Sequence, residues 1–274
     1  MRLVLLASAL VVVLAVPYLL LALRRRGWAQ WRTGVYLASC ALLWWCLAGT
    51  PATLRHRDPV WGVIGVAVAD VLVGFGLVVA APVRLWEETR GRRVGWLRNP
   101  LVMALGFPLV SATLNGALLV AAFSTSWFTR ALSDDTSWTW LLLACLLGGF
   151  VANLQLLSPD LVPAWITPGP RMVLALADGL LDELPGIIVM VVTNQVWGGV
   201  LWVTAQPVVV PMMALILLDW FRHERSAAQQ IDATLDAIDA AGGNTTTPWW
   251  VAGDPDAEGS GVGSAGSTTH PPGD

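Results

Sequence analysis

The sequence predicts an all-α, polytopic membrane helix bundle of about seven transmembrane helices, with the N-terminus outside and the C-terminus inside. Three observations predict this class. The 274 residues are 55% apolar and only 13% charged, with a mean hydropathy of +0.63, a balance that soluble globular domains do not have. Apolar stretches long enough to cross a bilayer, about 20 residues each, recur along the chain. The arginines are distributed unevenly between the connecting segments.

The apolar stretches give the expected spans. The first ends at a cluster of three arginines, Arg24 to Arg26, which is typical of a stop-transfer flank and not of a cleaved signal peptide. Later stretches end at Pro, Gly, Asp or Arg, as helix ends do. The spans are predicted at 3–23, 34–53, 59–81, 100–123, 137–157, 171–193 and 198–220.

The positions of the arginines predict the orientation. With the N-terminus outside, the outer side holds only Arg2, Arg55, Arg57 and Arg130. The other twelve of the sixteen fall on the inner side, and such an excess of inner basic residues sets the topology of membrane proteins. These inner residues are Arg24, Arg25, Arg26, Arg32, Arg84, Arg90, Arg92, Arg93, Arg98, Arg171, Arg222 and Arg225.

Tryptophan is abundant near the predicted span ends. Indole rings favour the headgroup region of a bilayer, so we interpret most of these residues as interface anchors. They are Trp28, Trp31, Trp86, Trp96, Trp127, Trp138, Trp140, Trp165, Trp197 and Trp220.

The chain turns polar after Trp220, which predicts three parts. Residues 1–220 form the seven-span bundle, residues 221–241 a cytoplasmic amphipathic helix, and residues 242–274 a disordered cytoplasmic tail rich in Gly, Ser, Thr, Pro and Asp. The helix is predicted because apolar residues recur at spacings of three and four. Its apolar face consists of Ala228, Ile231, Leu235 and Ile238.

Residue types that usually carry catalysis or metal binding are sparse. The histidines, His56, His223 and His270, all lie outside the spans, and the three cysteines lie inside apolar stretches without a CxxC pattern. We expect buried free thiols and no disulfide framework. No Walker loop, GxSxG or HExxH motif occurs, and no basic surface interleaved with aromatics indicates nucleic acid. The sequence therefore predicts no catalytic residue and no enzyme.

Carboxylates inside the predicted spans are the informative exceptions, because each costs several kcal/mol in the bilayer unless it faces protein or water. They are Asp70, Asp178, Asp182 and Glu183. The spacing of Asp178 and Asp182 places both on one helix face. We expect them to face the bundle interior, with Asp70 as the nearest partner and Pro185 kinking the sixth span. Amides that could hydrogen-bond to these carboxyls are Asn115, Asn153, Gln155 and Gln206.

Three interpretations of this polar site remain open. The carboxyls hold helices together through hydrogen bonds, or they form a proton or cation pathway, or they contribute to a metal site.

The closing segment resembles a known family. It contains Asn194-Gln195, Gly198-Gly199-Val200-Leu201-Trp202, Ala205-Gln206-Pro207 and a run from Asp219 to Asp232, DWFRHERSAAQQID. Earlier stretches fit in order: Tyr18 to Arg26 before Trp28, Ala81 to Leu85, Asn99 to Val102, and Ser158-Pro159-Asp160 before Pro163. Over about residues 15–240 the chain is similar to the CtaG family of membrane-integral cytochrome c oxidase assembly factors.

The resemblance implies specific site residues. Members of the family carry intramembrane histidines, expected to bind copper, in the third, fifth and sixth spans. Here the corresponding positions fall near Gly62 and Val66, near Trp138, Leu142 and Ala144, and at Asp182, so the chain resembles a divergent member that lacks these histidines. Imidazole is a good copper ligand and aliphatic groups are not. Copper is therefore implied by the resemblance alone. A second difference is that the glutamate of the family's GE-P motif is Gln206 here.

The resulting hypothesis is a membrane protein that assists assembly of respiratory cytochrome c oxidase, with copper insertion as the family's associated chemistry. Its partners would be the lipid bilayer and oxidase subunits, and its location the plasma membrane of a bacterium. Two alternatives stay open. One is a proton-coupled transporter that uses Asp70, Asp178, Asp182 and Glu183, and the other is a non-catalytic structural partner of a membrane complex.

Overall fold

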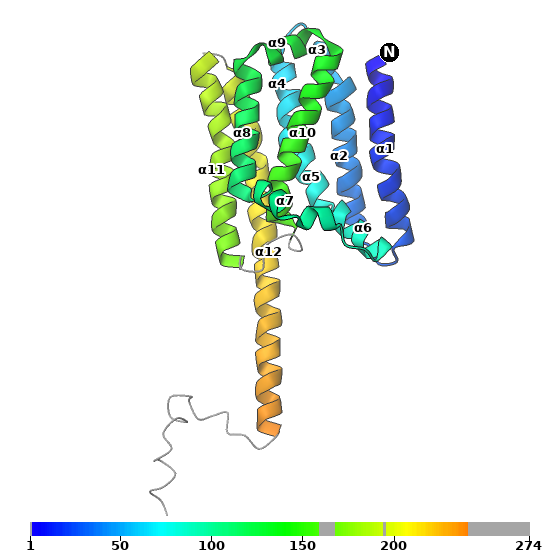
Figure 1. The fold of residues 1–274 in the computed structure, drawn as a ribbon, viewed down its shortest axis with the longest axis vertical. Helices are drawn as coiled ribbons and strands as arrows, with labels where there is room; N and C mark the ends of the chain where they lie inside the picture. The colour runs from blue at the N-terminus through cyan, green and yellow to red at the C-terminus, as the bar shows by residue number, and fades with distance from the viewer. Residues whose placement is uncertain (1, 159–167, 194–195, 241–274) are drawn as a thin grey trace, which may run out of the picture. The chain divides into compact units, whose positions relative to one another are not determined.

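The computed structural model describes residues 2–158, 168–193 and 196–240, and within these ranges the chain forms helices and no strand (Figure 1). The all-α prediction is confirmed. η1 is a π-helix and η2 a 3-10 helix. The elements are α1 (Arg2–Arg24), α2 (Gln30–Ala48), α3 (Thr50–Leu54), α4 (Pro59–Ala67), η1 (Val68–Val73), α5 (Gly74–Val79), α6 (Pro82–Arg90), η2 (Gly95–Arg98), α7 (Pro100–Leu105), α8 (Pro108–Ser124), α9 (Ser126–Ser133), α10 (Asp135–Leu157), α11 (Pro168–Thr193) and α12 (Trp197–Ala240).

Several helical segments are long and apolar enough to cross a membrane. Five qualify by themselves within the described residues, and α8 with α9, which are bent by 68°, make a sixth if the pair is one span. α11 has 26 residues but carries three carboxylates, which set it apart from these apolar spans. The chain is therefore a multi-pass membrane protein. The count of seven and the N-out orientation stay predictions.

The chain divides into two units, Met1–Trp220 and Phe221–Asp274. The described part of the second unit, residues 221–240, is helical and belongs to α12. Within this part the side chains of Ile231, Leu235 and Ile238 are exposed. The predicted disordered tail at 242–274 lies outside the described residues.

The core of the first unit is an apolar cluster contributed mainly by α2, α4 and α10. Its members with almost no exposed surface include Leu43, Leu47, Val63, Val66, Leu141 and Leu142. α1 joins this core through Tyr18, whose ring stacks on Tyr36 with centroids 3.8 Å apart. The Tyr18 hydroxyl also donates a hydrogen bond to the carbonyl of Ala80 at 3.0 Å. These contacts join α1 to α2 and to the residue that ends α5.

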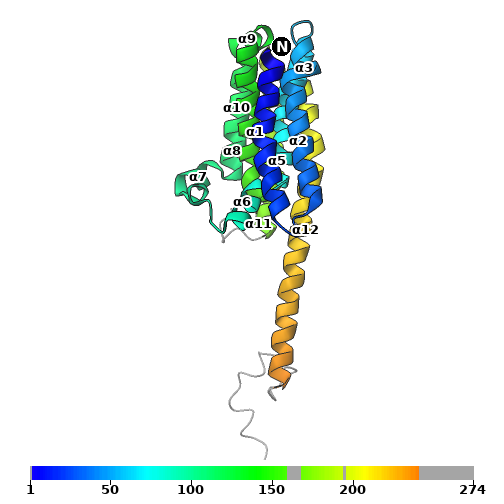
Figure 2. The same ribbon diagram turned by 90° about the vertical axis from the view of Figure 1, so that its right-hand side faces the viewer.

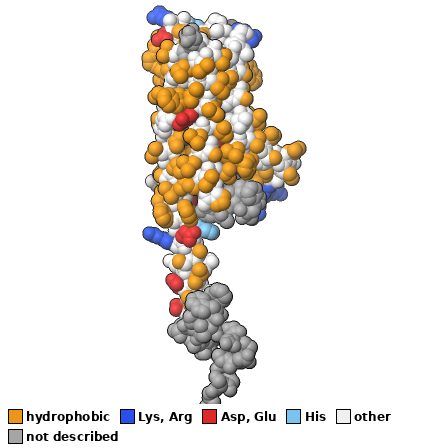
Figure 3. Space-filling view, turned by 90° about the vertical axis from the view of Figure 1, so that its left-hand side faces the viewer, with side chains coloured by type: hydrophobic (Ala, Val, Ile, Leu, Met, Phe, Trp, Pro, Cys, Tyr) orange, Lys and Arg blue, Asp and Glu red, His pale blue; other side chains and the backbone are white. Residues whose placement is uncertain are grey.

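Large apolar side chains are exposed on several outer helices of the first unit, and Figure 3 shows one face that they cover. Val13 and Leu23 of α1, Leu180 and Val191 of α11, and Val203 of α12 are all more exposed than buried. In a soluble protein an apolar patch of this size would be a liability. In a bilayer it is the surface that lipid requires.

Glycines bring neighbouring helices into backbone contact. A Cβ added to Gly74 of α5 would lie 2.8 Å from the backbone carbon of Gly149 in α10. A Cβ added to Gly186 of α11 would lie 2.7 Å from the carbonyl oxygen of Gly198 in α12. Small residues at helix interfaces permit this close approach in membranes, where van der Waals packing drives helix association.

The predicted span at 100–123 is wrong at its beginning. α7 ends at Leu105 and α8 begins at Pro108, so residues 100–105 form a separate short helix. Figure 2 shows α7 standing out to the side of the bundle. Pro108 explains the new start, because its fixed φ and missing N–H suit the first position of a helix.

The two ends of the first unit carry different connections. α3 and α9 lie at the end where the N-terminus lies, and α6 and α7 lie at the opposite end (Figure 1). We call these the α3–α9 end and the α6–α7 end. The arginine distribution predicts that the α6–α7 end faces the cytoplasm.

Candidate functional site

Two small cavities inside the first unit share a polar lining. Asp70 of η1, Asn115 of α8 and Asp182 of α11 line both of them. We call these three residues the carboxylate site. Each cavity has a volume of about 20 Å³. This is enough for one water molecule but not for a larger substrate.

Asp70 lies on the π-helix η1, an element that the sequence did not reveal. The carbonyl of Asp70 lies so close to Gly149 of α10 that a Cβ at Gly149 would overlap it. The Asp70 side chain is 3% exposed and accepts hydrogen bonds from Asn115 Nδ2, at 3.1 Å to Oδ1 and 3.4 Å to Oδ2. Single π turns inside α-helices are frequent at functional sites, and here the turn holds the most enclosed carboxylate of the site.

Asn115 links α8 to both η1 and α10. Its amide nitrogen donates to Asp70, and its amide oxygen lies against Gly148, where an added Cβ would overlap it. This oxygen is buried and has no hydrogen-bond partner among the described residues. The carboxylate site therefore keeps one unused acceptor, which in an apolar interior costs about 1–3 kcal/mol.

Asp178 lies one helical turn before Asp182 on α11. It is 1% exposed, and its Oδ1 has no partner among the described residues. Asp178 is not among the residues that line the two cavities. Of the two carboxyls predicted to share one helix face, Asp182 lines the cavities and Asp178 is buried outside their lining.

Glu183 and Gln206 belong to a different contact. Glu183 accepts hydrogen bonds from Gln206 Nε2 at 2.6 Å and from Trp202 Nε1 at 3.3 Å, both on α12. The turn of about 100° between successive helix residues separates Glu183 from Asp182. These two candidates therefore tie α11 to α12 and do not line the two cavities.

Two other amides named from the sequence serve local roles. Asn153 donates to the carbonyl of Gly149 in its own helix at 2.8 Å, although it also lines one of the two cavities. Gln155 donates to the carbonyl of Met103 in α7 at 2.7 Å. Gln155 thus tethers α7 to α10 and does not line the two cavities.

Replacement of Asp182 tests the carboxylate site. We expect Asp182→Asn to be tolerated, because an amide still forms hydrogen bonds in the cavity that Asp70 and Asn115 also line. We expect Asp182→Leu to destabilise the folded protein by about 1–3 kcal/mol, because it leaves polar neighbours without a partner. Folded yield in detergent, measured by size-exclusion chromatography, reports the difference.

A labelling experiment checks the direction of the same side chain. Asp182→Cys should react poorly with a thiol probe dissolved in the lipid phase, and Leu180→Cys, at a position 67% exposed, should react readily. Cys40, Cys46 and Cys145 are free and buried, so they give little background. Ready labelling at 182, together with full yield of the Leu variant, would contradict the interior placement.

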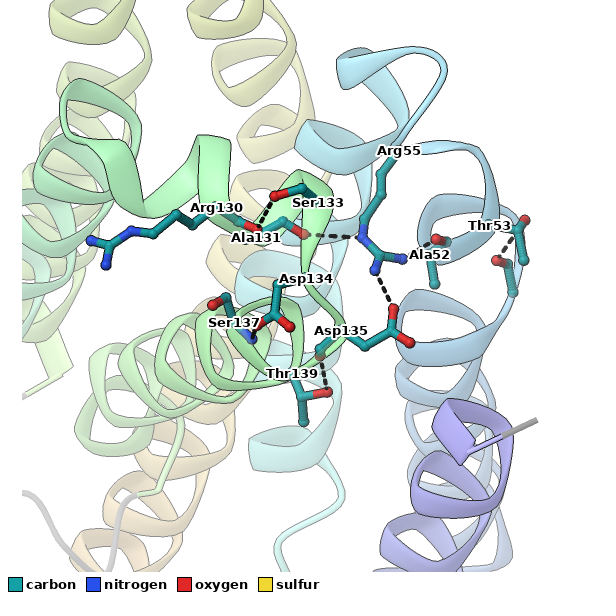
Figure 4. Close-up of polar contacts among 11 residues, drawn as sticks. Ala52, Thr53, Arg55, Arg130, Ala131, Ser133, Asp134, Asp135, Ser137 and Thr139 are labelled. Carbon is teal, nitrogen blue, oxygen red and sulfur yellow. Dashed lines mark hydrogen bonds and ion pairs between the residues drawn. The ribbon is translucent and has the colours of Figure 1, made fainter.

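Arg55 is a polar residue whose burial the sequence interpretation does not foresee. It lies in the connection after α3 at the α3–α9 end, on the side of the N-terminus as expected, but its side chain is 1% exposed (Figure 4). Its guanidinium donates to the carbonyl of Ala131 at 3.0 Å, to the carbonyl of Ala52, and to Asp135 Oδ1 at 2.5 Å. Arg55 therefore joins the α3 turn to the connection between α9 and α10.

The same end contains a helix cap for α10. The backbone N–H of Ser137 donates to Asp134 at 2.6 Å, as at many helix N-termini (Figure 4). This hydrogen bond lowers the pKa of the exposed Asp134 carboxyl. One sequence signal for the Arg55 cluster did exist, since Asp135 and Arg55 carry opposite charges on the same predicted side.

Arg171 forms a similar junction at the other end of α10. It was assigned to an inner loop, and the structure buries it to 7% exposure. Its guanidinium donates twice to the carbonyl of Leu156, once at 2.7 Å, and once to Asp219 Oδ2 of α12 at 2.8 Å. Arg171 therefore satisfies a carbonyl in the last turn of α10 and connects α10, α11 and α12.

The positions at which the CtaG family carries histidines are mostly packed with apolar side chains. Val66, Trp138 and Leu142 have no exposed surface, so Trp138 is a core residue and not the interface anchor expected from sequence. A Cβ on Gly65 would lie 2.9 Å from the Trp138 ring, which shows how fully that ring occupies its space.

The donor set at these positions does not fit a copper ion. Asp182 alone offers a ligand atom, and a lone carboxylate is a poor match for copper. Within the described ranges no group of three or more His, Cys, Asp or Glu side chains is placed to hold a metal.

Comparison with known proteins agrees with the order of motifs in the sequence. A family model described as cytochrome c oxidase caa3 assembly factor (Caa3_CtaG) matches residues 16–223. No curated protein and no solved structure matches the chain. The family match spans the helices that build the carboxylate site and the junctions at Arg55 and Arg171, and it confirms the resemblance seen in the closing segment. Because it covers well over half of the 274 residues, the chain belongs to the cytochrome c oxidase caa3 assembly factor family.

Proposed function

We propose that this chain assists the assembly of a cytochrome c oxidase by packing against its subunits in the membrane, without catalysis and without a copper ion at the family's histidine positions. The family match over residues 16–223 supports the assembly role. The apolar replacement of the histidine positions supports the absence of copper transfer at those positions. The proposed setting is the plasma membrane of a bacterium.

The structure suggests how such a protein serves as a docking partner. Its polar groups are largely used in internal junctions, namely Asp70 with Asn115, Glu183 with Gln206, and Arg171 with Asp219. The surface left for a partner within the first unit is therefore mainly apolar, and membrane helices associate through such surfaces by close packing. An assembly factor of this kind would stabilise an oxidase subunit before the remaining subunits bind.

Deleting the gene in its own organism tests the assembly role. We expect the haem a signal in reduced-minus-oxidised spectra of membranes to fall severalfold, because unassembled oxidase subunits are degraded. Expression of the wild-type chain from a plasmid should restore it. An unchanged haem spectrum and unchanged oxidase activity would contradict the assembly role.

Copper supply tests the second half of the proposal. We expect added copper not to restore the oxidase in the deletion strain, and elemental analysis of the detergent-purified chain to give less than one copper per chain. Rescue by copper, or stoichiometric copper that is lost on mutating Cys40, Cys46 or Cys145, would show copper delivery and overturn this half alone.

A further inference from the structure

An apolar crevice of about 190 Å³ lies between α10 and the short segment formed by η2 and α7. The segment contributes Trp96, Leu97, Val102 and Met103 to the lining, and α10 contributes Leu147, Phe150, Val151 and Leu154. This volume exceeds the roughly 150 Å³ of an engineered protein cavity that stays dry and binds benzene. The crevice is therefore large enough for hydrocarbon.

The crevice offers almost nothing to water. Apart from the indole N–H of Trp96, only Gln155 brings polar side-chain atoms to its lining, and the Gln155 amide nitrogen already donates to the Met103 carbonyl at 2.7 Å. Water needs two or more polar partners to occupy a cavity stably. An apolar group is the favourable occupant.

Two basic side chains lie in the connection between α6 and η2, just before the segment that lines the crevice. Arg92 and Arg93 are exposed, and neither has a hydrogen-bond or ion-pair partner among the described residues. Val94, the next residue, packs on the cluster of Leu97 and Leu154 at the crevice wall.

Glu87 of α6 fixes this connection in place. Its carboxylate accepts the Val94 N–H at 2.7 Å and Arg98 Nη1 at 3.1 Å. The negative charge of Glu87 is therefore opposed by Arg98, and among the described residues no carboxylate pairs with Arg92 or Arg93.

The segment also has the surface of an element in contact with lipid. Trp96, Leu101 and Leu105 are more exposed than buried. Figure 3 shows apolar side chains over the projection that this segment makes, with basic side chains at its lower edge. A surface that is apolar beside the bilayer and basic at its edge matches a molecule with a hydrocarbon chain and an anionic headgroup.

We propose that the crevice binds one acyl chain of an anionic phospholipid, whose phosphate is held by Arg92 and Arg93. A volume of about 190 Å³ cannot hold one turn of a protein helix about 10 Å across, but it can hold several methylene groups of one acyl chain. The site is independent of the proposed role in oxidase assembly.

Native mass spectrometry of the full chain in detergent tests the proposal with phosphatidylglycerol and phosphatidylcholine of identical acyl chains. We expect one phosphatidylglycerol to bind about tenfold more tightly than phosphatidylcholine. The double variant Arg92→Gln/Arg93→Gln should lose this preference. Val151→Trp, which fills the crevice, should weaken the binding of both lipids.

Matched variants control for general effects. Arg24→Gln/Arg26→Gln removes the same charge from exposed positions at the end of α1 and should keep the preference. Val173→Trp adds the same ring at a 64% exposed position of α11 and should bind both lipids as the wild type does.

A measurement on the unaltered protein covers the case in which a variant fails to fold. Phosphatidylglycerol with a photoreactive acyl chain should crosslink to peptides from residues 95–106 and 147–155. Crosslinks elsewhere only, or an unchanged lipid preference in the Arg92/Arg93 variant, would overturn the proposal. Protection of these peptides by a co-purified protein subunit in place of lipid would overturn it as well.

Discussion

Gly149→Ala should lower the free energy of unfolding by about 3 kcal/mol or more, the upper end of what overpacking costs in a filled core. The added Cβ would overlap the carbonyl oxygen of Asp70, which is backbone and cannot rotate away. Any adjustment must therefore separate α10 from η1 or distort the π turn. Unfolding in a denaturing detergent, followed by circular dichroism, measures the loss.

Alanine substitutions at two other glycines give a comparison with Gly149→Ala. Gly148→Ala should be milder, because the atom that it meets is the end of the Asn115 side chain. Gly199→Ala on α12 should cost nothing, because no atom outside its own helix lies within 4 Å of the added group. Equal stability of all three variants would show that the contact between α10 and η1 is not as close as described.

Arg55→Met should lower the free energy of unfolding by about 3 kcal/mol. The methionine keeps much of the side-chain volume but leaves the carbonyls of Ala52 and Ala131 without their donor, and each unpaired buried acceptor costs about 1–3 kcal/mol. The ion pair with Asp135 contributes little to this figure, because the Asp135 side chain is 59% exposed and regains water. Thermal denaturation in detergent reports the change.

Variants of neighbouring residues distinguish the contribution of the two carbonyl hydrogen bonds from that of the ion pair. Arg57→Met, two residues away and exposed, should leave the midpoint unchanged. Asp135→Asn should have a small effect of under about 1 kcal/mol. If Asp135→Asn proved as damaging as Arg55→Met, the ion pair would be the source of the stability and the two carbonyls would not.

Much of the fold could be predicted because its signals are local. Apolar length and the Pro and Gly residues at span ends predicted a helix at 171–193, close to the observed α11 at Pro168–Thr193. Residues 100–105 are as apolar as a true span, so composition could not separate α7 from α8. The contact that tethers α7 to α10 is a hydrogen bond from Gln155 to Met103, 52 residues away in the chain, which composition cannot reveal.

The sequence pointed to carboxyls inside the spans but not to their arrangement. The cost of burying charge pointed to Asp70, Asp178, Asp182 and Glu183, of which Asp70 and Asp182 line the two cavities. Which of them share a cavity depends on how α8, η1 and α11 pack, and no single helix encodes that packing. The burial of Arg55 could not be predicted, because an arginine in a short connection is usually solvated and its burial needs acceptors from the distant connection between α9 and α10.

The π turn at Val68–Val73 has a further consequence for the length of the third span. Hydrogen bonding from i to i+5 places one more residue in a turn than an α-helix does, so every residue after Val73 is rotated by about 100° from where a uniform α-helix would place it. Val63 and Gly74 are eleven apart, a spacing that would align them on one stripe of a straight helix. A sequence one residue shorter within this turn would form an ordinary α-helix and still present the same faces to α2 and α10. A single-residue deletion at Val68–Val73 can therefore preserve both the packing and the crossing of the membrane.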